Sequence, residues 1–167
     1  PENSETLYRM GRNQRLDGDP EEATLILREA LRLDGPETLL LCELGVCAID
    51  RGEDEEAMRY FREALRLEPN NGEAGWLLGL AMLAKGDTRS AETALEQAAT
   101  DGFPGAHASL GTALYMQNRV EEALSHFDEV IKAYAGDLGH PQAAYSIEQA
   151  EAIRLNRSKR QWLDRFR

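Results

Sequence analysis

The sequence predicts an all-α fold, an α-solenoid of about four helix-turn-helix repeats followed by a C-terminal capping helix. The hexapeptide REALRL at residues 28–33 returns unchanged at residues 62–67, which is 34 positions later. Glycines recur with the same spacing at Gly11, Gly45 and Gly79. Each copy also contains two segments of helical periodicity, and in the first three copies a glycine lies between them. Internal repeats of this length, each made of two helices, indicate a solenoid.

The repeats divide the 167-residue chain into two regions. Residues 1–135 hold the four copies, and the last step along the chain is shortened to 32 residues, from Gly79 to Gly111. Residues 136–167 lose the register and leave a loop and one further helix. The expected bounds of the repeats are about 4–36, 37–70, 71–103 and 104–135.

Individual helices have recognisable starts and stops. In the first repeat Asp19 and Pro20 open the second helix, because the carboxylate can cap unpaired amides and proline lacks an amide hydrogen. In the second repeat we expect helices at residues 38–50 and 54–67. Gly52 lies between them and can take the left-handed conformation that ends a helix. The third and fourth repeats follow the same plan.

The expected helix at residues 38–50 is apolar on nearly every side, with Glu43 as the charged residue between its ends. A helix with one face in water would show a polar stripe. In a solenoid, however, the first helix of a repeat packs against its own partner helix and against the neighbouring repeat. Two of its faces are therefore buried, and the third face remains for another role.

The second copy carries a pattern of large and small residues that resembles the tetratricopeptide repeat. It reads Leu41-x2-Leu44-Gly45-x2-Ala48, then Ala57-x3-Phe61, Ala64 and Pro69. The third copy departs from the pattern because Trp76 comes one residue late. The resemblance extends over residues 4–134 and implies a right-handed superhelix that binds other proteins and has no catalytic activity.

The resemblance also implies that the third face of each first helix lies on the concave inner wall. The expected inner-face residues are basic in the first repeat and mainly apolar in the others: Tyr8, Arg9, Arg12, Arg15, Leu39, Cys42, Val46, Ile49, Trp76, Leu77, Leu80, Leu83, Ala108, Thr112, Tyr115 and Met116. A contiguous exposed apolar strip marks an interaction surface. We therefore expect a protein or peptide partner to bind in an apolar groove with a basic wall at one end.

Two other interpretations of these residues stay open. Repeat packing could consume the apolar side chains, and the arginines could form a solvated end of the array. Some proteins of the resembled family hold acidic C-terminal tails with lysine, asparagine and arginine side chains on the inner faces. Here Glu43, Asp50 and Glu73 stand where such side chains would be needed, so we do not expect that mode of binding.

Composition excludes some classes of function. The 30 acidic and 19 basic residues give a formal net charge of −11, which argues against nucleic-acid binding because phosphate contacts need clustered Lys and Arg. No segment has the run of about 18 apolar residues that a membrane helix needs. Cys42 and Cys47 are expected on different faces of one helix and therefore reduced, which favours a cytoplasmic location. Since the chain starts at Pro1, a removed leader and a periplasmic location stay open.

Patterns for catalysis or metal binding are not evident. His107, His126 and His140 fall in separate elements without the spacing of a metal site. We find no glycine-rich phosphate loop and no nucleophile elbow. The sequence therefore predicts no enzymatic activity, no cofactor and no bound metal.

The C-terminal helix changes character along its length. Small and apolar residues near its start can cover the last repeat, as a solenoid cap must. From Arg154 onward there are six basic residues and one acidic one, with Trp162, Leu163 and Phe166 on one face. We favour a cap whose basic residues meet the acidic body. A second binding element, a membrane-surface contact and a homodimer contact are the alternatives.

Together these features predict a non-catalytic protein-protein interaction module, either a scaffold or chaperone-like. A structural subunit is the main alternative, its groove filled by its own C-terminal helix or by a second copy. A third interpretation is the recognition arm of a larger enzyme.

Overall fold

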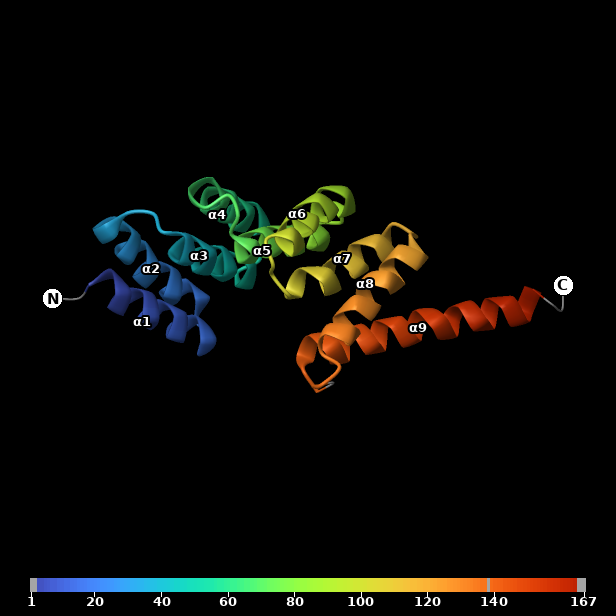
Figure 1. Ribbon diagram of the computed structural model, residues 1–167. Coiled ribbons are helices and arrows are strands. Elements are labelled where there is room, and N and C mark those ends of the chain that lie inside the picture. Colours follow the sequence, from blue (N-terminus) through green and yellow to red (C-terminus); the bar gives the residue numbers. More distant parts are fainter. Residues whose placement is uncertain (1–2, 138, 165–167) are drawn as a thin grey trace.

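A computed structural model describes residues 3–137 and 139–164, with side chains as far as residue 161. This part of the chain contains helices and no strands: α1 (Ser4–Leu16), α2 (Pro20–Asp34), α3 (Thr38–Asp50), α4 (Asp54–Leu67), α5 (Gly72–Ala84), α6 (Thr88–Thr100), α7 (Gly105–Met116), α8 (Val120–Ala133) and α9 (Pro141–Asp164). The helices form an elongated array whose first and last helices lie at opposite ends (Figure 1). The all-α solenoid expected from the sequence is confirmed.

The first eight helices pack as four pairs, and a glycine lies at the closest point of each pair. In the second pair, a Cβ atom at Gly45 would lie 2.3 Å from Cε1 of Phe61. Phe61 is fully buried, so the absence of a side chain on α3 is what lets α4 approach. The sequence periodicity therefore marks positions of close packing between helices.

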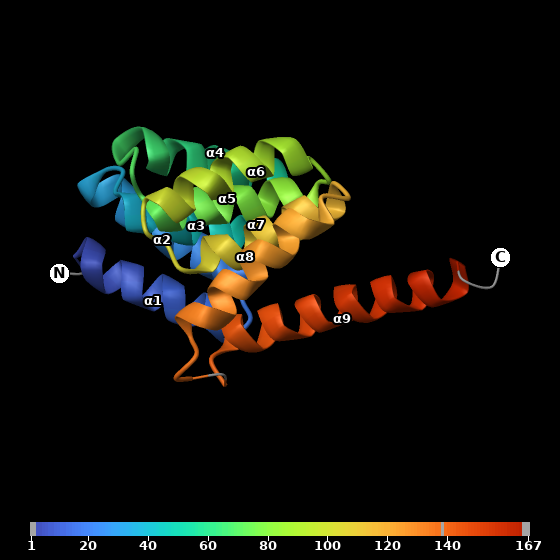
Figure 2. The same cartoon turned by 45° about the vertical axis from the view of Figure 1, so that its right-hand side comes forward.

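The odd-numbered helices form one side of the array. The pairs α1 and α3, α3 and α5, and α5 and α7 are in contact, whereas successive even-numbered helices of the described chain are not. Helices that converge on one side and diverge on the other make a curved layer. The odd-numbered helices therefore line the inner side (Figure 2).

Packing of α3 explains its apolar sequence. This helix contacts α1, α2, α4 and α5, and most of its side chains are buried. Gly52, which follows it, has a positive φ of 75°, as the stop signal predicts. Two faces of α3 are thus used for repeat packing, as the sequence argument requires.

A polar link joins the third and fourth repeats. The amide of Gln117 donates to the carboxylate of Glu92 over 2.8 Å, and Arg119 pairs with the same carboxylate. Burial alone would raise the pKa of Glu92, but these two hydrogen bonds lower it overall. The link therefore requires an ionised carboxylate.

Helix α9 covers the end of the array. Ala150 and Ile153 are buried in one core cluster with Phe127 of α8. Farther along, Arg154 binds both carboxylate oxygens of Asp128 at 2.7 Å, and Arg157 pairs with Glu121. Two basic side chains of α9, those of Arg154 and Arg157, thus meet acidic side chains of α8.

The aromatic face expected at the far end of the chain cannot be placed. The side chains of Trp162 and Leu163, and the whole of Phe166, lie outside the described residues. Among the described helices, none has the length and apolar character of a membrane span.

Candidate functional site

The expected inner-face residues fall into three groups by exposure. Six are exposed: Arg9, Arg12, Leu39, Ile49, Tyr115 and Met116. Eight are half-buried: Tyr8, Arg15, Val46, Trp76, Leu77, Leu80, Leu83 and Thr112. Two are buried, Cys42 and Ala108, at 6% and 5% exposure. Packing takes up nearly all of the surface of these two side chains, so Cys42 offers little to a partner, and Ala108 offers only the small area that faces the space between α5 and α7.

The structure gathers one part of this set around an apolar hollow. Five of the expected residues, from α5 and α7, line it: Trp76, Leu80, Leu83, Ala108 and Thr112. The hollow measures about 290 Å³, and its lining includes no charged side chain. A space of this kind suits an apolar side chain much better than a whole peptide.

Trp76 is held in place by its neighbours. Its indole Nε1 donates to Oγ of Ser109 over 2.9 Å, and its ring lies 5.0 Å from that of Phe103 between centroids. The shift of one residue noted in the sequence is what brings it here. Gly75 takes the position that faces α6, where a Cβ would lie 3.3 Å from Ala98, so Trp76 turns toward α7. The indole thus presents a fixed apolar surface to the hollow.

Three further residues of the hollow come from α9 and were missed by sequence reasoning. Pro141, Gln142 and Tyr145 close one side, and the Tyr145 hydroxyl lies 2.9 Å from the hydroxyl of Thr112. The loop before α9 breaks the repeat register, so no spacing in the sequence predicts where this helix begins to pack. The only available signal was the expectation of a capping helix.

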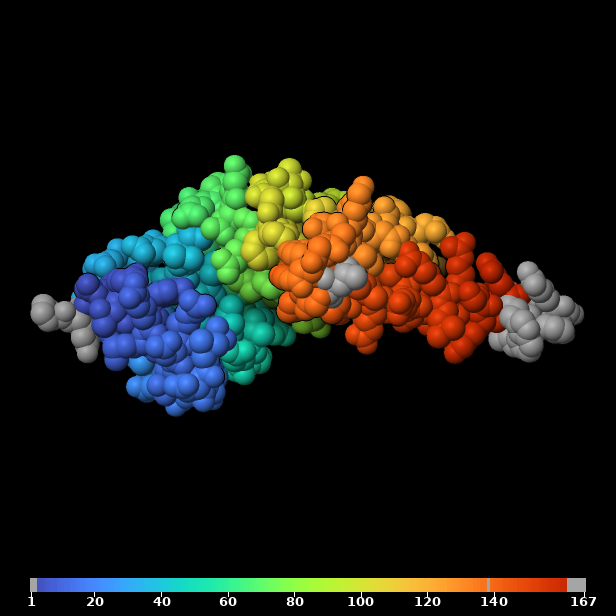
Figure 3. All heavy atoms as spheres, turned by 60° about the horizontal axis from the view of Figure 1, so that its bottom comes forward, coloured from blue at the N-terminus to red at the C-terminus, as the bar shows by residue number. Residues whose placement is uncertain are grey.

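Tyr115 and Met116 lie in a different depression, beyond the hollow along α7. It measures about 870 Å³ and lies between the end of α7, the start of α8 and the middle of α9. Its lining from α9 includes basic residues, namely Arg157, Lys159 and Arg160. The apolar strip is therefore divided into two hollows, and the second has a basic edge. Figure 3 shows α9 at one end of the molecule and the first repeat at the other.

Much of the basic wall expected in the first repeat is used within the protein. The guanidinium of Arg15 lies 2.6 Å from the carboxylate of Glu43 and 3.5 Å from that of Asp50. This ion pair accounts for Glu43, the charged residue in the otherwise apolar α3. Arg9 pairs with Glu5 at 2.7 Å, and Arg12 is exposed. Arg15 thus joins the first repeat to the second, whereas the exposed pair of Arg9 and Glu5 lies within α1.

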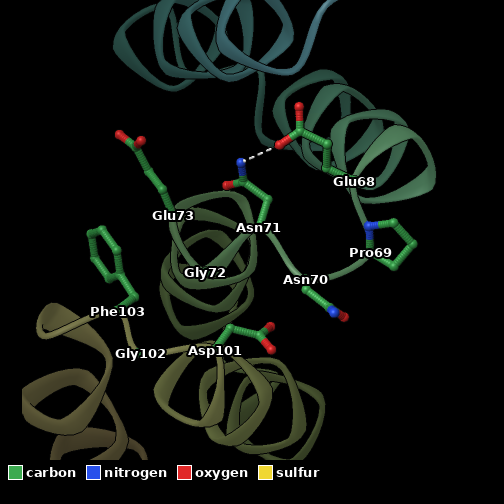
Figure 4. A pocket seen from close by; sticks show the side chains of 9 residues that line it. All are labelled: Glu68, Pro69, Asn70, Asn71, Gly72, Glu73, Asp101, Gly102 and Phe103. Carbon is green, nitrogen blue, oxygen red and sulfur yellow. Dashed lines mark hydrogen bonds between the residues drawn. The ribbon is translucent and has the colours of Figure 1, made fainter.

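A polar pocket of about 570 Å³ lies where the α4–α5 and α6–α7 loops meet (Figure 4). Three carboxylates surround it, those of Glu68, Glu73 and Asp101. Asn71 accepts from the amide of Ala74, and its own amide group donates to Glu68 over 2.9 Å. The polar groups of this pocket therefore serve to cap α5 and to shape the loop, and they point to no particular ligand.

Both cysteines are free thiols buried in the core. Burial is the main cause that raises the pKa of Cys42 to about 12 and that of Cys47 to about 11. Because the thiolate is the reactive form, neither side chain is activated. The two sulfur atoms are not joined in the structure, which agrees with the expected placement of the cysteines on different faces of one helix.

The histidines behave differently from what their spacing suggested. His107 of α7 and His126 of α8 lie with their Nδ1 atoms 3.4 Å apart, and Glu129 of α8 is next to both. Burial is the main cause that lowers the pKa of His126. His140 lies elsewhere, stacked on Tyr134. The three histidines do lie in separate elements, but a helical hairpin brings together two that are 19 positions apart, which their spacing in the sequence did not indicate.

Known proteins resemble this chain at the level of family and of fold. Models of the family described as "Tetratricopeptide repeat" match residues 38–71 and residues 76–137, together more than half of the chain. Among curated proteins, none matches the sequence.

Several solved structures resemble the fold. A thermophilic TPR protein of Thermus thermophilus is 19% identical, with coverages of 93% of this chain and 83% of its own, and a TM-score of 0.78. YrrB, described as a TPR protein with an unusual peptide-binding site, is 20% identical, with coverages of 87% and 74% and a TM-score of 0.70. MamA protein is 24% identical, with coverages of 83% and 77% and a TM-score of 0.70. At these identities the likeness concerns the fold alone.

Proposed function

The chain belongs to the tetratricopeptide repeat family, and we propose that it is a non-catalytic module that binds a peptide or helix of a partner protein along its inner face. The observation that carries the proposal is the apolar hollow between α5, α7 and α9. An apolar side chain of the partner, of the size of leucine or phenylalanine, inserts there beside Trp76. Large aromatic residues are frequent carriers of binding energy in such pockets.

The charges around the inner face indicate where an acidic group of the partner lies. In the first repeat, Arg12 is exposed, but carboxylates lie nearby. The pKa of Tyr8 is raised, mainly by burial and then by the charge of Glu43, which acts on it more strongly than the opposite charge of Arg12. The depression one turn farther along α7 has Arg157, Lys159 and Arg160 at its edge. Glu121 also lines it and pairs with Arg157, so Lys159 and Arg160 are the basic groups offered to a partner. Because this basic edge is adjacent to Tyr115 and Met116, we favour it over Arg12 for the acidic group.

The groove residues outside the hollow have a supporting role in this proposal. Leu39 and Ile49 of α3 are exposed at 58% and 37%, so they can extend the apolar contact toward the first repeat. Leu77 and Val46 are half-buried and contribute less surface. The partner segment would thus cross from α3 to α9 over the inner side of the array.

A peptide-display selection on the purified chain would identify ligands even though the natural partner is not identified. A selected peptide should then be titrated by calorimetry against Trp76→Ala and against Thr112→Phe, which fills the hollow without removing Trp76. We expect Trp76→Ala to cost about 2 kcal/mol, a loss of about thirtyfold in affinity. Leu25→Ala is the matched control, because Leu25 is an exposed apolar residue of α2, a helix of the outer side.

The result decides between this function and the structural alternative. Circular dichroism must show that all variants are folded. Peptides that bind equally well to both hollow variants would contradict the proposal. A mass of two or more chains in solution, lost in Thr112→Phe, would instead favour self-assembly through the same hollow.

A further inference from the structure

A second cluster of chemically active side chains lies outside the apolar hollow, at the junction of α7 and α8. It consists of His107 in the first turn of α7 and of His126 and Glu129 on α8. One ligand atom from each of the three residues lies within 4.8 Å of the others. Two imidazoles and a carboxylate are a common ligand set for zinc.

The distances within the cluster match those between the ligands of a metal ion. The Nδ1 atoms of the two histidines are 3.4 Å apart, and each lies 3.5 Å from the same Oε2 of Glu129. Hydrogen bonds of the N–H···O type are shorter, at about 2.7–3.2 Å. Ligand atoms at about 2.0–2.2 Å from a tetrahedral zinc ion lie about 3.3–3.6 Å from one another. The three atoms therefore already have the mutual spacing of zinc ligands.

Rigid elements hold the three side chains in this arrangement. His126 and Glu129 are three residues apart on one helix, so they share a face of α8. The pair α7 and α8 is closely packed, because a Cβ atom at Gly111 would lie 2.8 Å from the ring of Phe127. The site is thus arranged before any ligand arrives, which lowers the cost of binding.

The surroundings favour a cation and leave it accessible. Glu96 of α6 and Glu122 of α8 are near enough for their charges to act on His126. The side chains of His107, His126 and Glu129 are exposed by 38%, 27% and 57%. An ion can enter from solvent, and a water molecule can take the fourth coordination position.

We propose that His107, His126 and Glu129 form a binding site for one divalent transition-metal ion, with zinc as the best fit. The ion would join the first turn of α7 to α8 within the last repeat. This proposal does not depend on the proposed peptide groove, because none of its three ligands lines the hollow.

The direct test is titration of the untagged, chelator-treated chain with zinc alone, by calorimetry or by competition with a chromogenic chelator. We expect one zinc ion per chain. Loss of a ligand in His107→Asn or His126→Asn should weaken binding by at least about 10–100-fold, because changing a residue that only supports a metal ligand already has an effect of that size. His140→Asn is the matched control, because His140 stacks on Tyr134 outside the cluster.

Two further readouts distinguish a built site from surface binding. Zinc should raise the Tm of the parent and of His140→Asn, and leave that of His126→Asn unchanged, because binding to the folded form alone stabilises it. Cobalt(II) should produce the intense visible absorption of a tetrahedral complex in the parent and in His140→Asn, but not in the two ligand variants. Absence of saturable binding, or binding that survives both His107→Asn and His126→Asn, would overturn the proposal.

Discussion

Replacing Gly45 with alanine tests whether the repeated glycine is the point of closest contact between paired helices. The added Cβ would lie 2.3 Å from Cε1 of Phe61 and 2.8 Å from its Cδ1 and Cζ. Carbon atoms in ordinary contact are about 3.5–4.0 Å apart, so a shift of roughly 1 Å is required. Phe61 is completely buried and cannot turn into solvent.

The magnitude follows from two opposing effects. Overpacking in a closely packed core costs about 1–3 kcal/mol, and the short distance here indicates the upper part of that range. Alanine is favoured over glycine in a helix by about 1 kcal/mol. The net loss in the free energy of unfolding is therefore about 1–2 kcal/mol, which lowers Tm by about 2–8 °C for a chain of this size.

Urea unfolding followed by circular dichroism would measure this loss, with hydrogen exchange to locate it in α3 and α4. Gly75→Ala is the matched control, because its Cβ would lie 3.3 Å from Cβ of Ala98 and meets no ring. The control has the same gain in helix propensity, which its milder contact with Ala98 offsets only in part, so it should be as stable as the parent or slightly more stable. Equal stability of Gly45→Ala and Gly75→Ala would refute the packing argument.

Three other outcomes are expected. At neutral pH Glu92→Gln should be less stable than the parent, and this difference should disappear in acid. The pKa of Glu92 is below its usual 4.5 in the folded chain, so the carboxylate adds to the free energy of unfolding above that pH, and this contribution falls as the pH drops through the lowered pKa. Urea titration at several pH values would measure it. Placing a charge at the fully buried Ala150 should detach α9; Ala150→Glu is expected to aggregate or to lower Tm, as light scattering and calorimetry would detect. The thiols of Cys42 and Cys47 should resist a thiol reagent at pH 8 and react fully in denaturant, because burial raises both pKa values far above that pH.

Much of the fold could be predicted from the sequence because each repeat carries its own local information. The spacing of the glycines and alanines, the acidic helix starts and the Gly52 stop are all signals read within about 34 residues. Helices at residues 38–50 and 54–67 match α3 and α4 as the structure has them. Because the repeats are similar to one another, each packs against the next in the same way.

Less of the candidate site could be predicted, because exposure depends on which helices meet. The inner-face assignment named Trp76, Leu80 and Thr112, which the structure gathers around one hollow, but it also named Cys42, which packing buries. It also treated Arg15 as free, whereas Glu43 from the next repeat pairs with it. The helical period of a sequence indicates the direction in which a side chain points from the helix axis. It does not indicate how much of that side chain a neighbouring helix covers.

The sequence by itself determined the architecture: a set of small residues in register, two helices for each repeat and an acidic surface. Tertiary structure alone decided the chemistry of the surface. It brought Tyr145 of α9 against Thr112 and placed His107 beside His126 and Glu129. The physical reason is that local periodicity specifies each helix and its own pair, whereas contacts between side chains of different helices depend on their relative position and rotation, which no short segment of the sequence encodes.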